Sequence, residues 1–138
     1  MSHSGLSLWR GSGNVIENIY DTISEQYRRE CRERMMVVLP KGFYRECAVH
    51  LDSLSDRATA LRDSGVAGDE YDEVIERIVT TNRLVSDLRR IRTEKISRMA
   101  MFAASGGVPD TSPLSPDELD LFRSMRDLAK DHLGRVLR

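Results

Sequence analysis

Apolar residues recur at intervals of three and four residues along most of the chain, which is the pattern of amphipathic helices. The longest such stretch runs from Asp69 to Ala104. Its apolar positions share one broad face of a helical wheel: Tyr71, Val74, Ile78, Leu84, Val85, Leu88, Ile96, Met99, Phe102 and Ala103. Residues 78–82 are β-branched and then polar, so we expect a kink or a restart of the helix there.

Two cations interrupt this apolar face. Arg92 lies one turn after Leu88, and Lys95 lies two turns after it. A buried cation needs a partner, because removing one member of a buried ion pair typically costs about 3–5 kcal/mol. Glu30 is an acid on the apolar stripe of an earlier helix. We therefore expect Glu30 to pair with Arg92 or Lys95.

Three further helices are predicted. The first runs from about Val15 to Met35, and the second opens at Pro40, which suits a first helical turn, and ends near Asp63. The last begins at Ser115, where Ser-Pro-Asp-Glu matches a capping box. Its apolar arc is wide enough for two contact surfaces, one for the core and one for a partner. The candidates for the subunit interface are Leu119, Leu121, Phe122, Met125 and Leu128.

No strand pattern of useful length appears, so we predict an all-α fold, a bundle of four to five helices with no β-domain in this chain. Residues 1–14 are rich in Ser and Gly and are expected to form a flexible N-terminal arm. Residues 15–138 are expected to form one helical domain, with a linker at 105–114 before the last helix.

Composition and charge narrow the choice of partners. The chain is 40% hydrophobic and 31% charged, as in helix-rich globular proteins. Its 21 Lys and Arg against 22 Asp and Glu give a net charge of -1, so any DNA contact is expected to be weak or indirect. No apolar run approaches the ~20 residues of a membrane span and no signal peptide opens the chain, so we expect a cytoplasmic protein without a membrane partner.

The reactive side chains are scattered. Cys31 and Cys47 each lie within a helical pattern and are expected to be buried free thiols. His3, His50 and His132 are far apart in the sequence, and each is expected at the surface or at its edge. We therefore expect no metal site.

Common catalytic motifs are missing as well. The chain has no phosphate-binding loop, zinc-protease motif, hydrolase elbow or dinucleotide fingerprint, so we expect no catalytic residue and no cofactor. One enzymatic alternative stays open. Arg92 and Lys95 could bind an anionic substrate inside a helical bundle, as in the helical chorismate mutases, with Glu30 as their acid.

Four motifs, in order, resemble an archaeal GINS subunit. An R-x-E ends at Glu30, and residues 39–44 read LP-x-x-FY. An R-x-x-K-I spans residues 92–96, and residues 114–118 read L-S-x-x-E. The resemblance covers about Val15 to Arg138.

The resemblance implies a helical A-domain in a non-enzymatic replication factor of four subunits, identical or different. Such a complex joins the MCM helicase and a RecJ-like protein at the replication fork, and contacts primase or polymerase. Glu30, Arg92 and Lys95 would form an internal polar bracket, and the helix from Ser115 would contribute to subunit contacts. The turn that opens the second helix would consist of Leu39, Pro40, Phe43 and Tyr44.

Family members of this type usually carry a small β-rich B-domain after the A-domain. The chain ends at Arg138 without one, so we expect either a shortened chain or an A-domain alone. A generic helical adaptor is the remaining alternative.

Overall fold

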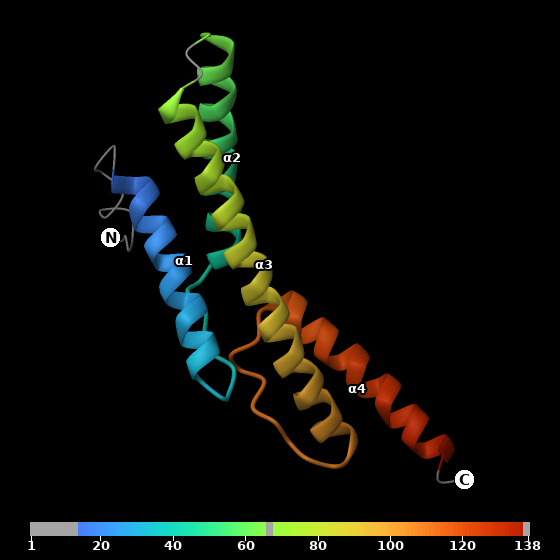
Figure 1. The fold of residues 1–138 in the computed structure, drawn as a ribbon. Helices are drawn as coiled ribbons and strands as arrows, with labels where there is room; N and C mark the ends of the chain where they lie inside the picture. The colour runs from blue at the N-terminus through green and yellow to red at the C-terminus, as the bar shows by residue number, and fades with distance from the viewer. Residues whose placement is uncertain (1–13, 66–67, 137–138) are drawn as a thin grey trace. The chain divides into compact units, whose positions relative to one another are not determined.

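Four α-helices make up the fold in the computed structural model, which describes residues 14–65 and 68–136 (Figure 1). They are α1 (Asn14–Arg32), α2 (Phe43–Asp63), α3 (Asp69–Ala104) and α4 (Pro116–Val136). The described residues contain no strand, which confirms the all-α prediction. Residues 1–13 of the expected arm lie outside the described residues, and Asn14 opens α1.

The described residues divide into two compact units. The first unit contains the described part of residues 1–28 together with 40–87. The second contains 29–39 together with the described part of 88–138. Each unit is therefore built from two stretches that are separate in the sequence. Both α1 and α3 contribute residues to each unit.

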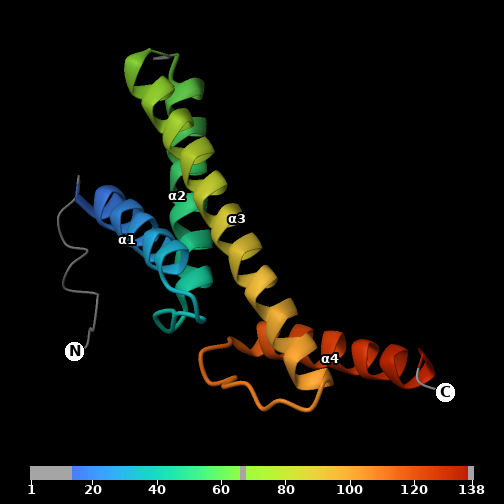
Figure 2. The same ribbon diagram turned by 60° about the horizontal axis from the view of Figure 1, so that its bottom comes forward.

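In the first unit, α2 lies beside the first half of α3 in both ribbon views (Figures 1 and 2). Leu54 and Ala58 of α2 are one turn apart and pack against Val74 of α3. Around these buried side chains lie the half-buried Leu61, Tyr71 and Ile78. The spacing of three and four residues seen in the sequence thus produces this core.

The start of α2 differs from the prediction. The helix begins at Phe43 rather than Pro40, because Gly42 has a left-handed backbone (φ 71) that an α-helix cannot contain. The Phe43 N–H donates to the Pro40 carbonyl at 3.0 Å, so Pro40 opens a turn. Phe43 is buried, and its ring meets that of Tyr44 edge-on with 5.4 Å between centroids.

The helix α3 is continuous over 36 residues, so the helix does not restart at residues 78–82. Thr81 within that stretch is 0% exposed, and burial of this kind overrides a weak helix propensity. The placement of Phe102 on the buried face is also wrong, because its side chain is 58% exposed. Phe102 follows Lys95 and Met99 along a line of α3 that borders a groove instead of another helix.

The buried line of α1 contains two polar residues, Glu30, which was predicted on the apolar stripe, and Gln26, which was not. Ile19, Ile23, Gln26 and Glu30 are buried, at spacings of four, three and four residues. Since Glu30 points inward, its neighbour Cys31 is turned outward, and the prediction that Cys31 is buried is wrong. Cys47 is buried, as predicted, and both thiols are free.

His50 is buried rather than exposed, because it follows Cys47 by three residues and precedes Leu54 by four on the buried line of α2. Burial, together with the nearby Arg77 cation, lowers the pKa of His50 below 6.5, so the ring is neutral near pH 7. His132 is exposed, as predicted, and His3 lies outside the described residues.

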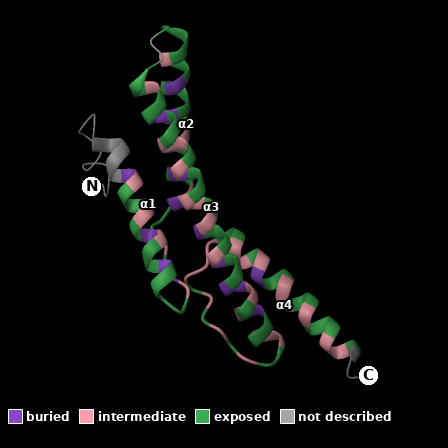
Figure 3. Ribbon diagram, in the orientation of Figure 1, coloured by how far each residue is buried: buried purple, intermediate pink, exposed green. Residues whose placement is uncertain are grey.

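In the second unit, the C-terminal part of α3 packs on α4. Ile96 and Ala100 of α3 and Phe122 of α4 form the buried core. Phe122 is the one buried residue among the described side chains of α4, and most of that helix is half-buried or exposed (Figure 3). The residues that pack around the core are Met36, Met99, Ala103, Leu114, Leu119, Leu121 and Met125.

We predict that the two thiols differ sharply in alkylation. Burial, with a smaller effect of Glu46, raises the pKa of Cys47 to about 12, so almost no thiolate forms at about pH 8. N-ethylmaleimide should therefore label Cys31 and spare Cys47 in the native protein, whereas both should react in denaturant. Peptide mass spectrometry would measure this, and equal labelling of the two thiols under native conditions would contradict the burial of Cys47.

Candidate functional site

A buried ion-pair network, the polar bracket, lies in the second unit and consists of Glu30, Arg92, Lys95 and Glu118. Arg92 Nη1 donates to Glu30 Oε1 at 2.7 Å, and Lys95 Nζ donates to Glu30 Oε2 at 2.7 Å. The side chains of Glu30 and Arg92 are 0% exposed. The acid and the two cations that stood out in the sequence therefore meet at one point.

Glu118, in the first turn of α4, is the member that the sequence reading missed. It binds the Arg92 guanidinium through both oxygens, at 2.7 Å from Nε and 2.8 Å from Nη2. It also closes the predicted capping box: the Ser115 N–H donates to Glu118 Oε1 at 3.0 Å, and the Glu118 N–H donates to Ser115 Oγ at 3.3 Å. Charge balance in the sequence could have indicated this fourth member, because one predicted carboxylate, Glu30, leaves one of the two buried cations without a counter-charge.

Backbone groups in the last turn of α1 and in the segment after it complete the contacts of the bracket. Lys95 Nζ donates to the carbonyls of Glu30 and Glu33 at 2.8 Å and of Met35 at 2.9 Å. Arg92 Nη1 donates to the Val37 carbonyl at 2.6 Å, and the Val37 N–H donates to Glu30 Oε2 at 3.1 Å. This segment has no helix or strand of its own, so the bracket supplies partners for its backbone.

The segment before α4 is held in the same way. Arg92 Nη2 donates to the Pro113 carbonyl at 3.2 Å, three residues after Asp110 and just ahead of the capping box. With its bonds to Glu30, Glu118 and Val37, the guanidinium makes five hydrogen bonds, which equals its number of N–H groups. Neither Arg92 nor Lys95 has a donor left for a substrate.

The charges within the bracket cancel, with two cations against two carboxylates. Burial alone would lower the pKa of Arg92, but hydrogen bonds and charges from Glu118 and Glu30 outweigh it and raise that pKa. Burial likewise favours neutral Glu118, but hydrogen bonds from Arg92 and Ser115 outweigh it and lower the pKa of Glu118 below 4.5. Arg92 and Glu118 are therefore charged near pH 7, and their paired contacts make the arrangement a structural clamp.

The residues suggested for a subunit interface occupy different environments. Phe122 is 4% exposed and belongs to the core, so it is not available to a partner. Leu119, Leu121 and Met125 pack against that core and are half-buried, whereas Leu128 is 71% exposed. Of the candidate interface residues, those that a partner could reach are therefore the exposed Leu128 and the half-buried Leu119, Leu121 and Met125.

An apolar groove of about 420 Å³ lies between α3 and α4, and we call it the α3/α4 groove. Met101 and Leu128 are its most exposed apolar side chains, at 50% and 71%. The lining residues are Ser97, Ala100, Met101, Met125, Leu128, Ala129, His132 and Leu133.

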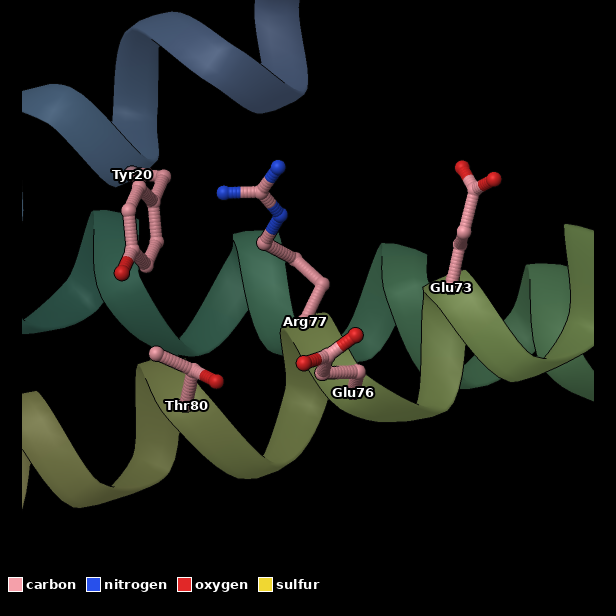
Figure 4. A pocket seen from close by; sticks show the side chains of 5 residues that line it. All are labelled: Tyr20, Glu73, Glu76, Arg77 and Thr80. Carbon is pink, nitrogen blue, oxygen red and sulfur yellow. The ribbon is translucent and has the colours of Figure 1, made fainter.

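A smaller cavity of about 300 Å³ lies in the first unit and is lined by polar side chains (Figure 4). Arg77 stacks over the Tyr20 ring at 4.4 Å from its centroid, next to Glu76 and Thr80, with Glu73 one turn away on α3. No group of three or more potential metal ligands occurs among the described residues. In that same part of the chain, no helix has the length and apolar character needed to cross a membrane.

Replacing Glu30 by Gln is predicted to destabilise the protein by about 3 kcal/mol or more, because Arg92 and Lys95 would lose their shared buried carboxylate. The matched control is Glu94→Gln, which removes the exposed pair with Arg90 and should cost about 0.5 kcal/mol or less. Denaturant unfolding would measure both values. A similar small loss in the two variants would exclude a structural role for the bracket.

The bracket also predicts acid sensitivity. Since the pKa of Glu118 is lowered on folding, the unfolded chain binds the proton first, and stability from this carboxylate is complete above about pH 4.5 and is lost as pH falls through the folded pKa. Glu118→Gln should therefore flatten the loss of stability as the pH falls below about 4.5, as measured by denaturant unfolding. Asp117→Asn, at the exposed neighbouring position, should leave the pH dependence as in wild type. An unchanged slope in Glu118→Gln would contradict the assignment.

The helical architecture agrees with a comparison to known families. Residues 22–137 match the family model Sld5, described as the GINS complex protein helical bundle domain. This range contains all of α2 and α3 and every member of the polar bracket. No curated protein and no solved structure matches the chain. The chain therefore belongs to the family of GINS complex protein helical bundle domains, which are subunits of the GINS replication complex.

Proposed function

We propose that the chain is a non-catalytic subunit that assembles with other GINS subunits into a tetramer. In that assembly it links the MCM helicase to other proteins of the replication fork, namely a RecJ-like protein and a primase or polymerase. Family membership supports the role in the complex, and the motif resemblance supports the tetramer and these particular partners. The observation that carries the assembly role is the exposed apolar lining of the α3/α4 groove.

The groove has the character of a contact surface. Leu128 projects from α4 and is 71% exposed, and Met101 of α3 is 50% exposed beside it. Neither side chain adds to the core formed by Ile96, Ala100 and Phe122. Burying both against a second subunit would remove apolar area from water, which is the main driving force of subunit association.

The polar bracket makes this surface rigid before a partner arrives. Its bidentate bond between Arg92 on α3 and Glu118 on α4 fixes the start of α4. The core residues Ile96 and Phe122 hold the two helices together one turn further on. A preformed groove loses less conformational entropy on binding than a loose one, so the bracket favours assembly without touching the partner.

The enzymatic alternative has little support. An anionic substrate would need free N–H donors on Arg92 or Lys95, and every donor of both side chains already faces a carboxylate or a carbonyl. Opening the bracket for a substrate would uncover buried charges at a large cost.

We predict that Leu128→Glu weakens assembly while the chain stays folded, because it places a charge in an apolar contact that the free chain exposes to water. Light scattering at several concentrations would measure the mass of the chain alone. Co-purification with a partner GINS subunit would measure hetero-assembly. A loss of about tenfold or more in affinity is expected.

The matched control is Val79→Glu, which makes the same kind of change at a side chain that is 59% exposed on α3 in the first unit. It should leave assembly as in wild type. Normal assembly of Leu128→Glu in both measurements would exclude the α3/α4 groove as a subunit contact. Equal loss in the two variants would show that the effect is not specific to the groove.

A further inference from the structure

A second and larger groove in the second unit borders the polar bracket, and we call it the Met-lined groove. Its volume is about 810 Å³. Three separate segments build its walls: Met35 and Met36 come from the segment after α1, Met99 and Phe102 from α3, and Val108 from the loop before α4. It shares no lining residue with the α3/α4 groove.

The apolar lining of this groove is unusually open to water. Met35 is 69% exposed, Phe102 is 58% exposed and Val108 is 92% exposed. Single exposed apolar residues are common on protein surfaces, but here three from three segments surround one concavity. Their burial by a ligand would contribute binding free energy at roughly 25 cal/mol per Å² of apolar surface removed from water.

The walls of the groove are held in place by the bracket. Lys95 binds the Met35 carbonyl at 2.9 Å, and Arg92 binds the Pro113 carbonyl at 3.2 Å. The groove is therefore not a product of loosely placed loops, and it requires little ordering when a ligand binds.

The turn after α3 fixes the aromatic wall. The Gly107 N–H donates to the Phe102 carbonyl at 2.9 Å, and a Cβ atom at Gly107 would lie 2.4 Å from the Phe102 ring. Only glycine at this position lets the ring keep its place in the groove. The substitution Gly107→Ala would push the ring aside while leaving the charges of the groove unchanged.

The charged side chains of the groove are mainly positive. Arg34 and Arg98 are exposed, and neither has a carboxylate partner among the described residues. Lys95 is neutralised by Glu30. Asp110 is the one acid in the described part of the lining, and its Oδ1 accepts the Ser112 N–H at 3.0 Å.

We propose that the Met-lined groove binds a short acidic peptide of a partner protein, with bulky apolar residues placed between Asp or Glu residues. Methionine side chains adapt to apolar anchors of different shapes, and Arg34 and Arg98 can each bind a carboxylate through two N–H groups. A nucleic acid is a poorer fit, because Phe102 is the one aromatic ring among the described lining residues on which a base could stack. The proposal does not depend on GINS assembly, for which the α3/α4 groove is the proposed contact.

The first test measures binding of a fluorescein-labelled peptide of about twelve residues in which pairs of Glu or Asp alternate with Phe, Leu and Met. Fluorescence anisotropy with the full chain would give its affinity. Two control peptides replace every acid by Lys, or every apolar anchor by Ser. The acidic amphipathic peptide should bind about tenfold or more tightly than either control, and added salt should weaken it.

Charge reversal tests the two arginines. Arg34→Glu and Arg98→Glu should each weaken binding of the acidic peptide by about tenfold. The control Arg83→Glu reverses an exposed charge on α3 in the first unit and should leave the affinity unchanged. Gly107→Ala should also weaken binding, through the displaced Phe102 ring, with the chain still folded.

Methionine methyl resonances locate the ligand, since the two grooves contain different methionines. With ¹³C-labelled methionine methyls, the peptide should shift the signals of Met35, Met36 and Met99 and leave those of Met101 and Met125 in place. Because Leu128→Glu alters only the other groove, it should not change these shifts even if it abolishes assembly.

Several outcomes would overturn the proposal. These are equal binding of the Lys-substituted peptide, peptide shifts confined to Met101 and Met125, and displacement of the peptide by an oligothymidylate of similar length. Dilution of the chain alone should leave the signals of Met35, Met36 and Met99 unchanged. A shift of these three signals on dilution would assign the groove to a second copy of the chain instead.

Discussion

The carboxylate of Glu30, shared between Arg92 and Lys95, is the interaction on which the second unit depends. It neutralises two cations at 2.7 Å each, and the second carboxylate, Glu118, balances the remaining charge. Through these four side chains, the segment after α1, the C-terminal half of α3 and the start of α4 are joined. Loss of one charge would leave another buried and unpaired, so the network is stable only as a whole.

An apolar cluster of equal volume could be as stabilising, but it could not hold these segments in the same way. Residues 33–39 and 105–115 contain no helix or strand, and their carbonyl groups need hydrogen-bond donors. Arg92 and Lys95 supply donors in defined directions to Val37, Met35 and Pro113. The free-energy cost of burying these charges is thus offset by directional hydrogen bonds that hold the two segments in place. Nonpolar contacts do not provide such bonds.

The sequence predicted the helices and three of the four members of the bracket, because each is a periodic or local signal. Apolar spacing gave the four helices, and an acid and two cations on apolar faces gave the ion pairs of Glu30. The bond between Glu118 and Arg92 was not predictable in this way, because the capping box alone already explains a glutamate at position 118. The outward turn of Cys31 and the exposure of Phe102 depend on which line of each helix meets another element, and apolar spacing alone does not fix that line.

The same four side chains support both grooves. Substitutions in the bracket should therefore affect both surfaces, whereas substitutions of exposed lining residues should affect one surface only. Arg92 and Glu118 fix α4 against α3 and so shape the α3/α4 groove, while Lys95 and Arg92 fix the walls of the Met-lined groove. A change at Arg92 would therefore impair assembly and peptide binding together, by loosening both surfaces. Leu128 and Arg98 are exposed side chains outside the bracket, so changes at these positions act on one surface each. A substitution that impairs only assembly or only peptide binding therefore identifies a residue that contacts the partner. A substitution that impairs both identifies a residue of the bracket that supports the two grooves.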